Sequence, residues 1–214
     1  MKLVSINVSK PIVVESAGKK VSTGIFKTPI SGPVVVTTLN IEGDGQADLT
    51  VHGGVDKAVY AYSLDHYTYW SQTLERDALP HGQFGENLTI EGLNESECCI
   101  GDRWRIGTAE FAITQPRQPC FKLGIRFGDD DMPKRFTKSG LTGAYLKVLR
   151  EGMISVGDEV KVLARGYGNV SVLEAFRAYM NPAAPASQEV YARVLRVQHL
   201  ADVWRTKIAT RLKM

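Results

Sequence analysis

Short apolar runs separated by glycines are the main pattern of residues 1–165. Residues 2–8 alternate between two sets of side chains, which is the pattern of a half-buried strand. Apolar or β-branched runs at 34–39, 58–62, 87–90 and 110–114 predict further strands, and Gly-Asp turns precede two more at 103–106 and 159–163. Many short strands joined by turns favour a closed or partly closed β-barrel over a parallel sheet, so we expect a mainly β fold.

Helical spacing of apolar side chains interrupts this pattern twice and replaces it after residue 166. Ser63 can cap a helix over residues 64–74, and a short helical turn is expected over residues 131–137. Further on, Ser171 and Ser187 can each cap a helix, and the apolar positions between residues 200 and 212 predict a third. We therefore expect a barrel domain over residues 1–165 and a small three-helix extension over residues 166–214.

The composition is that of an ordinary globular protein, with 43% hydrophobic and 23% charged residues in a chain of 214. No apolar stretch approaches the ~20 residues of a membrane helix, and the first residues lack the apolar core of an export signal. We expect a soluble, cytoplasmic protein with reduced thiols and no membrane partner. The net charge of +3 does not require a nucleic acid polymer as partner, because such proteins normally have a strongly basic face.

The three cysteines fall into two kinds of environment. Cys98 and Cys99 are adjacent, form no C-x-x-C pair and suit packing positions, which argues against zinc and iron–sulfur sites. Cys120 lies in a proline-stiffened segment between Arg117 and Lys122, whose positive charges would favour the thiolate, the form that ligates metals. A buried, inert Cys120 is the alternative.

Three other segments combine glycine with polar side chains. In residues 43–57, His52 precedes two glycines that would let backbone N–H groups approach a ligand closely, so His52 is balanced between a structural and a functional role. Residues 84–88 and 23–27 taken alone suggest turns into strands. In those turns Asn87 would be hydrogen-bonded and Lys27 would be a solvated surface charge.

Together these segments resemble the MOSC family, domains related to the carboxy-terminal part of molybdenum-cofactor sulfurases. The resemblance rests on residues 23–27, 43–57, 84–88, 115–120 and 140–143, which occur in the family's order. It covers most of residues 1–165 and is closest to the stand-alone bacterial YiiM-like branch, which is associated with resistance to 6-hydroxylaminopurine. The three helices expected at the end of the chain also match that branch.

The resemblance implies a MOSC-type (pyruvate-kinase-like) β-barrel that binds the molybdenum cofactor, molybdopterin, with Cys120 as the molybdenum ligand. One soft protein thiolate suffices, because the dithiolene of the pterin would supply the other sulfur ligands. Lys27 and His52 would complete the catalytic set. The expected contacts of the anionic, phosphate-bearing cofactor are Thr23, Gly53, Lys57, Asn87, Gln115 and Arg117.

Proteins of this branch resemble reductases of N-hydroxylated compounds, so the expected substrate is a small molecule such as a hydroxylamino-purine. His52 could donate a proton, since histidine titrates near neutral pH. The sequence has no flavin, haem or iron–sulfur signature, so electrons are expected from a separate donor protein. Two alternatives stay open: a sulfur carrier acting through a Cys120 persulfide, and a non-catalytic carrier of the cofactor. Assembly as a homodimer is a further open expectation.

Overall fold

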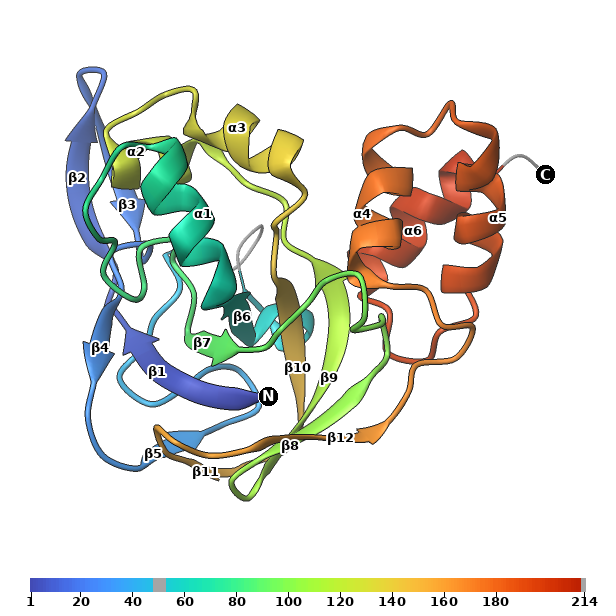
Figure 1. Ribbon diagram of the computed structural model, residues 1–214, viewed down its shortest axis with the longest axis horizontal. Coiled ribbons are helices and arrows are strands. Elements are labelled where there is room, and N and C mark those ends of the chain that lie inside the picture. Colours follow the sequence, from blue (N-terminus) through green and yellow to red (C-terminus); the bar gives the residue numbers. More distant parts are fainter. Residues whose placement is uncertain (48–52, 213–214) are drawn as a thin grey trace.

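The computed structural model describes residues 1–47 and 53–212, which form a mixed, sheet-rich fold with six α-helices (Figure 1). The strands are β1 (Lys2–Val8), β2 (Ile12–Ser16), β3 (Lys19–Thr23), β4 (Thr28–Ile30), β5 (Val34–Val36), β6 (Val59–Ser63), β7 (Leu88–Glu91), β8 (Arg103–Ile106), β9 (Ala109–Pro116), β10 (Ala144–Arg150), β11 (Gly152–Ile154) and β12 (Val160–Ala164). The helices are α1 (Asp65–Thr73), α2 (Phe121–Phe127), α3 (Met132–Ser139), α4 (Val172–Met180), α5 (Pro185–Val194) and α6 (Asp202–Arg211), with a 3₁₀ turn, η1, at Val55–Lys57.

Eight strands form the main sheet, in the order β12-β8-β9-β10-β6-β7-β1-β4. Neighbouring strands are antiparallel except β6 and β7, which run parallel with Ala61 opposite Leu88. β5 pairs with β11, and β2 pairs with β3, in two separate two-stranded sheets. β1 spans the residues whose alternation predicts it, and β8 has the predicted bounds as well.

The expected closed barrel is not confirmed, because the strand order in the described residues is open, with β12 at one edge and β4 at the other. The start of β1 nevertheless meets the start of β12 through a single bridge between Lys2 and Glu159. Leu3 N also donates to Asp158 O at 2.9 Å, and Gly157 N donates to Leu3 O at 2.8 Å. The sheet therefore curves far enough to bring these strands together without a continuous ladder between them.

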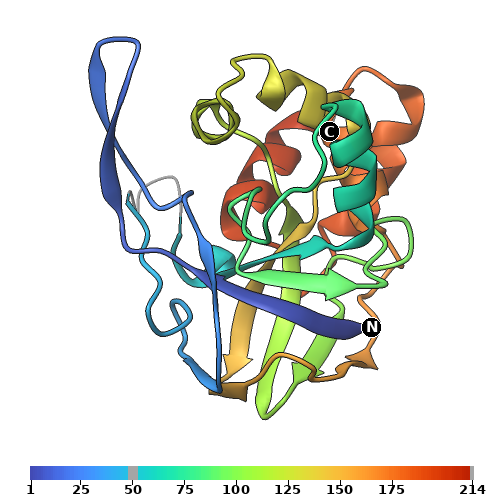
Figure 2. The same ribbon diagram turned by 60° about the vertical axis from the view of Figure 1, so that its left-hand side comes forward.

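Strands β2 and β3 form an arm that stands away from the main sheet, as Figure 2 shows. Their register pairs Ile12 with Thr23 at the base and Ser16 with Lys19 at the tip. Only Thr23 is buried, and the other side chains are exposed or half-buried. Because both faces of the arm are accessible, no alternation of apolar and polar residues marks it, and the sequence pattern does not predict these strands.

Helix capping agrees with the sequence at α4 and differs at α5. Ser171 Oγ accepts a hydrogen bond from Glu174 N at 3.0 Å, as the capping-box spacing predicts. The predicted cap at Ser187 is wrong, because α5 begins at Pro185, whose fixed φ suits the first helical turn. Ser187 lies inside the helix, where its hydroxyl donates to Asn181 O at 2.8 Å.

Two clusters of buried apolar side chains hold the fold together. The larger cluster runs from the sheet into the last three helices and includes Trp104, Tyr191 and Trp204. The smaller cluster is mostly aromatic and packs α1, α2 and α3 together, with the rings of Trp70 and Phe136 stacked at 6.0 Å. Since the larger cluster crosses residue 165, the division of the chain into two domains at that point stays a prediction.

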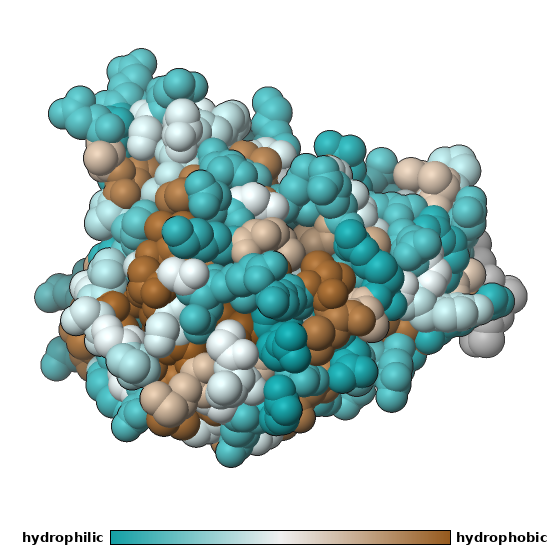
Figure 3. All heavy atoms as spheres, turned by 60° about the horizontal axis from the view of Figure 1, so that its bottom comes forward, coloured by the Kyte–Doolittle hydropathy of each residue, from teal (hydrophilic) through white to brown (hydrophobic). Residues whose placement is uncertain are grey.

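No helix in residues 1–47 or 53–212 is long and apolar enough to span a bilayer. Where β5, β11 and β12 lie together, polar side chains divide the apolar ones into several areas (Figure 3). The exposed apolar side chains of these strands are Val35, Met153, Val162 and Leu163. This face therefore has a mixed surface of the kind that singly exposed apolar residues produce.

Candidate functional site

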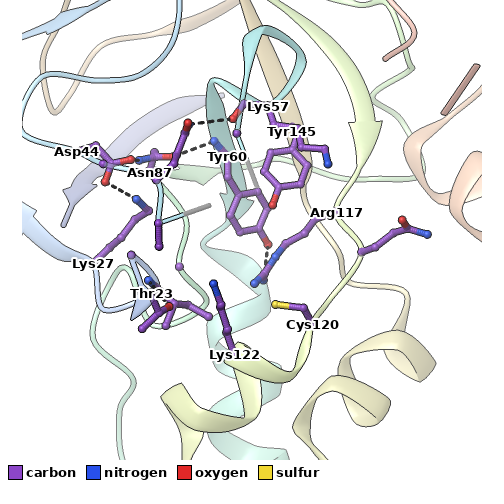
Figure 4. A pocket seen from close by; sticks show the side chains of 18 residues that line it. Thr23, Lys27, Asp44, Lys57, Tyr60, Asn87, Arg117, Cys120, Lys122 and Tyr145 are labelled. Atoms are coloured by element: carbon purple, nitrogen blue, oxygen red, sulfur yellow. Dashed lines mark hydrogen bonds and ion pairs between the residues drawn. The ribbon is translucent and has the colours of Figure 1, made fainter. Parts of the chain in front are cut away.

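A pocket opens between the base of the arm, the β9–α2 connection and strands β6 and β10 (Figure 4). Residues from 23–27 and 44–47 line it together with residues from 117–122, and Tyr60 and Tyr145 contribute from the strands. Its cavity volume of about 100 Å³ is small beside the ~300–1,000 Å³ of pockets that surround a drug-sized ligand. The pocket can therefore enclose one end of a larger molecule, whose remainder would lie across the mouth.

Lys27 and Asp44 form a buried ion pair in the wall of this pocket, with only 7% and 4% of these residues exposed. The Asp44 carboxylate also accepts hydrogen bonds from Ser9 N and Asn87 Nδ2, each at 2.9 Å. Burial lowers the pKa of Lys27, and the charge and hydrogen bond of Asp44 oppose that shift. Lys27 is thus a desolvated ammonium group held by a carboxylate, not the solvated surface charge that its local sequence suggests.

A glycine allows the chain to pass close to Lys27. Gly82 has a φ of 81°, and a Cβ atom at this position would lie 2.7 Å from the Lys27 carbonyl oxygen. A larger residue would clash with the backbone of Lys27 and would also be strained in this conformation. Gly82 therefore helps to fix where the Lys27 side chain begins.

Asn87 ties three segments together at the edge of the pocket. Its Nδ2 donates to Asp44 Oδ2 and, at 3.3 Å, to Asn7 O, while its Oδ1 accepts from Tyr60 N at 3.0 Å. Both amide hydrogens of the side chain are therefore engaged within the protein. Asn87 lines the pocket as predicted, but its geometry suits it to position Asp44 rather than to donate to a ligand.

Arg117 lies buried against aromatic rings on another side of the pocket, with 5% of the residue exposed. Its guanidinium carbon is 4.7 Å from the Tyr60 ring centroid and 5.3 Å from that of Phe136, and Nη1 donates to the Tyr60 hydroxyl at 3.4 Å. The Tyr60 hydroxyl donates in turn to Thr142 O at 2.9 Å. Burial raises the pKa of Tyr60 although Arg117 opposes the shift, so this phenol stays neutral at pH 7. These contacts hold a permanent positive charge in one place.

Cys120 is the cysteine that reaches the pocket, and it is half-buried directly before α2. Figure 4 shows its side chain beside those of Arg117 and Lys122. Cys98 and Cys99 are buried, and burial raises the pKa of both thiols. The two adjacent cysteines are therefore neutral packing residues, as the sequence predicts, and Cys120 is the accessible thiol.

A second lysine, Lys57, also reaches the pocket. Lys57, in η1, lines the pocket with Gly53, and its Nζ lies 5.9 Å from the Tyr145 ring centroid. Burial lowers the pKa of Lys57, Lys207 adds to that shift, and Asp56 opposes it. His52 lies outside the described residues, so its place in the catalytic set stays a prediction.

The two remaining predicted cofactor contacts differ in their access to the pocket. Thr23 lines it at the base of the arm, where its hydroxyl accepts a hydrogen bond from Ile25 N at 3.2 Å. Gln115 is buried on β9 and lies outside the described lining. Its Nε2 donates to Pro116 O at 3.3 Å, and its Oε1 has no partner among the described residues. The geometry therefore favours a direct contact for Thr23 and not for Gln115.

Sequence reasoning did not propose Asp44, Tyr60 or Tyr145 as site residues, and it used Lys122 only as a neighbour of Cys120. Asp44 could have been found, because it lies between two glycines in the polar segment that was singled out. The tyrosines had no such signal, since in strands they are indistinguishable from core residues.

The residues of the pocket fit an anionic cofactor that takes one thiolate from the protein. Among the described lining residues, Lys27, Lys57, Arg117 and Lys122 oppose one carboxylate, that of Asp44. No three His, Cys, Asp or Glu side chains of the described residues come together to hold a metal ion. A metal held by molybdopterin would bring ligands from its own organic group to this pocket.

Comparison with known proteins places the chain among relatives of known family. The family model of the MOSC domain matches residues 48–161. The chain is 42% identical to the uncharacterized protein YflK of Bacillus subtilis over 203 residues, which cover 95% of this chain and 90% of that protein. It is also 35% identical over 163 residues to a protein of Gibberella moniliformis named Reductase, a match that covers 75% of this chain and 29% of that protein.

Solved structures extend the similarity to the whole chain. The crystal structure of YiiM from Geobacillus stearothermophilus is 33% identical, has a TM-score of 0.83 and aligns over 99% of both chains. The helices after β12 are included in this alignment, and the MOSC match alone spans more than half of the sequence. The chain therefore belongs to the MOSC domain family, in its YiiM-like branch.

Proposed function

We propose that this protein is a molybdenum-cofactor-dependent reductase of small N-hydroxylated compounds, with hydroxylamino-purines as representative substrates. The observation that carries the proposal is the convergence of one accessible thiol, Cys120, with four cationic side chains in a single pocket. Membership of the MOSC family supports a function related to the molybdenum cofactor. The fungal relative named a reductase supports oxidoreductase activity.

The residues of the chain would bind and orient the cofactor from two sides. Cys120 would ligate molybdenum through its thiolate, because a soft sulfur ligand suits a metal that changes oxidation state. Arg117 and Lys122 would attract the anionic group. Arg117 cannot swing away from its aromatic neighbours, so its charge is already in place before a ligand arrives. When bound, the cofactor would supply the two-electron chemistry that no protein side chain offers.

Reduction of an N-hydroxylated compound consumes two electrons and two protons: R–NHOH + 2 H⁺ + 2 e⁻ gives R–NH₂ + H₂O. Lys27 is suited to deliver a proton into the pocket, because burial lowers its pKa and makes its ammonium group a stronger acid. The ion pair with Asp44 keeps this group in one orientation. His52 is the second proposed donor, and the electrons would come from a separate donor protein.

The first experiment measures molybdenum and pterin in protein made in hosts that can and cannot synthesise the cofactor. Protein from the competent host is then supplied with 6-hydroxylaminopurine and reduced methyl viologen. We expect bound cofactor and conversion of the substrate to adenine, with loss of at least 100-fold in Cys120→Ala and little change in the matched variant Cys99→Ala.

Three results would contradict the proposal. Protein from the competent host without molybdenum and pterin would remove the reductase and the cofactor carrier together. A persulfide on Cys120 of metal-free protein would favour the sulfur carrier. Bound cofactor that supports no turnover but passes to an apo-enzyme would favour the non-catalytic carrier.

A further inference from the structure

The chain segments on two sides of the pocket differ in charge from the rest of the sequence. Two segments flank the pocket: residues 9–27, which form the arm and its base, and residues 117–126, which end within α2. Together they contain seven of the 26 basic residues and one of the 23 acidic residues. The remaining residues contain 19 basic and 22 acidic side chains, so the surplus of positive charge lies beside the pocket. Three of these lysines are exposed: Lys10, Lys19 and Lys20.

Apolar side chains are exposed in the same two segments. Phe121 follows Cys120 directly and is 61% exposed, and Val13 of the arm is 65% exposed. Large exposed apolar side chains with cations around them are typical of the centre and the rim of a transient protein interface. The exposed apolar side chains of β5 and β11, Val35 and Met153, include no aromatic ring.

The arm has no packing role that explains its length. Its two strands pair only with each other in the described structure, and Figure 2 shows them standing clear of the helices. Glu15 pairs with Lys20 and Ser16 with Lys19, so the two lysines lie at the tip. An isolated two-stranded hairpin is at best marginally stable in water, so an exposed arm of this kind gains from a partner that covers it.

We propose that the β2–β3 arm and the first turn of α2 form the docking surface for an acidic electron-donor protein, of the class of small flavin or iron–sulfur proteins. The inference rests on the proposed reductase function, which needs two electrons from outside the chain for each N–O bond reduced. The donor is oxidised by the same two electrons. A partner that covers Phe121 lies close to the proposed metal ligand, because adjacent Cα atoms are only ~3.8 Å apart.

Charge selects the partner and orients it. The exposed lysines of the arm attract an acidic protein over about a Debye length, ~10 Å at 0.1 M salt. The surface beyond α2 has mixed charge, because Asp129 is paired with Arg135 and because Lys134 and Lys138 are exposed. An acidic partner is therefore attracted chiefly by the arm.

Binding is the first test and does not depend on cofactor loading. An acidic flavodoxin serves as the probe, and its affinity for the full chain is measured by surface plasmon resonance at 20 mM and 300 mM salt. We expect salt to weaken binding, and we expect the double variant Lys19→Glu, Lys20→Glu to weaken it at least tenfold at low salt. Lys161→Glu is the matched control, because Lys161 is exposed on β12 and should leave affinity unchanged. Equal affinity of the arm variant and the wild type would overturn the proposal, as would binding to RNA or anionic vesicles but not to flavodoxin.

Turnover with two donors separates the docking surface from the proposed chemistry. With flavodoxin as donor, the arm variant should reduce 6-hydroxylaminopurine at least tenfold more slowly than the wild type. With methyl viologen, which needs no docking surface, the two rates should agree within twofold. Equal loss with both donors would overturn the docking role. Absence of viologen-driven turnover in the wild type would instead contradict the reductase function, and the binding measurement would still decide the docking surface.

Discussion

The ion pair between Lys27 and Asp44 allows the clearest test of how the pocket is held together. Replacing Asp44 by Asn removes the charge that faces the Lys27 ammonium and puts an amide group where three donors converge. Removing one partner of a buried pair costs about 3–5 kcal/mol, because the other charge is left uncompensated. The Asn side chain keeps one acceptor oxygen, so we expect a loss near the lower limit, about 3 kcal/mol of unfolding free energy.

The companion variant is Lys27→Met, which removes the charge and keeps much of the side-chain volume. Combined with Asp44→Asn it leaves no unpaired charge, and replacing both partners of a buried pair is often close to neutral. The double variant should therefore be about 1–2 kcal/mol more stable than Asp44→Asn alone. Urea unfolding of the wild type, both single variants and the double variant, followed by tryptophan fluorescence, gives the coupling free energy.

The pH dependence gives an independent check of the same pair. The pKa of Lys27 is already lowered by burial, so the unfolded chain binds more protons than the folded one between that pKa and 10.5. The contribution of Lys27 to the free energy of unfolding therefore rises with pH across that interval. Asp44→Asn removes the carboxylate that opposes the lowering of the Lys27 pKa, so the pH interval over which stability rises should extend to lower pH. Lys27→Met should abolish the contribution of this lysine to the pH dependence.

Two results would refute this reasoning. In the first, the losses of unfolding free energy in the two single variants add up to that of the double variant within about 0.5 kcal/mol. The two side chains would then not stabilise each other. The second is an unchanged pH dependence in Asp44→Asn. Either outcome would show that Lys27 reaches solvent or another partner in the folded protein.

Three further predictions concern accessibility and buried polar groups. Iodoacetamide should label Cys120 in the native protein at least tenfold faster than the two buried cysteines, as measured by peptide mass spectrometry; equal rates would contradict their burial. Asp56→Ala should lower the unfolding free energy by about 1–2 kcal/mol, because the Asp56 carboxylate accepts a hydrogen bond from Asp202 N at the start of α6. Limited trypsin digestion should then cut the variant more rapidly near η1. An unchanged digestion rate would argue against a stabilising role for this hydrogen bond. Tyr67→Phe removes a hydrogen bond to the buried Glu86 and should raise the already raised pKa of that carboxyl further. As pH rises from 4.5 to 8, the unfolding free energy of the variant should therefore fall by about 1–2 kcal/mol more than that of the wild type. Parallel curves of unfolding free energy against pH, measured by urea unfolding, would contradict this.

The sequence identifies the strands that carry apolar or β-branched runs and fails where a strand is exposed on both faces. β1 has an alternating sequence and its bounds are predicted correctly, although Ser5, Ile6 and Asn7 are all buried in the structure. The arm exposes both faces and gives no periodic signal. α2 was missed for a different reason: it has only seven residues, follows Pro119 and contains Gly124, all of which oppose a helix prediction.

The candidate site divides in a similar way. Cys120 and Arg117 were identified because their neighbours in the sequence are unusual, and both line the pocket. The environment of Lys27 could not be predicted, because its partner Asp44 lies 17 residues away and meets it only through the fold. Gln115 was predicted from a motif that gives the order of residues but not the direction of each side chain, and it lies outside the described lining.

The meeting of β1 with the start of β12 has a consequence for how the chain folds during synthesis. Residues 1–3 leave the ribosome well before their backbone partners at residues 157–160, which follow only after most of the sheet has been made. Contacts between such distant parts of a chain slow folding, because a long loop must close before they are gained. The first strand is therefore exposed on that side throughout most of translation, and the nascent protein has a lasting need for protection against aggregation that the finished fold does not share.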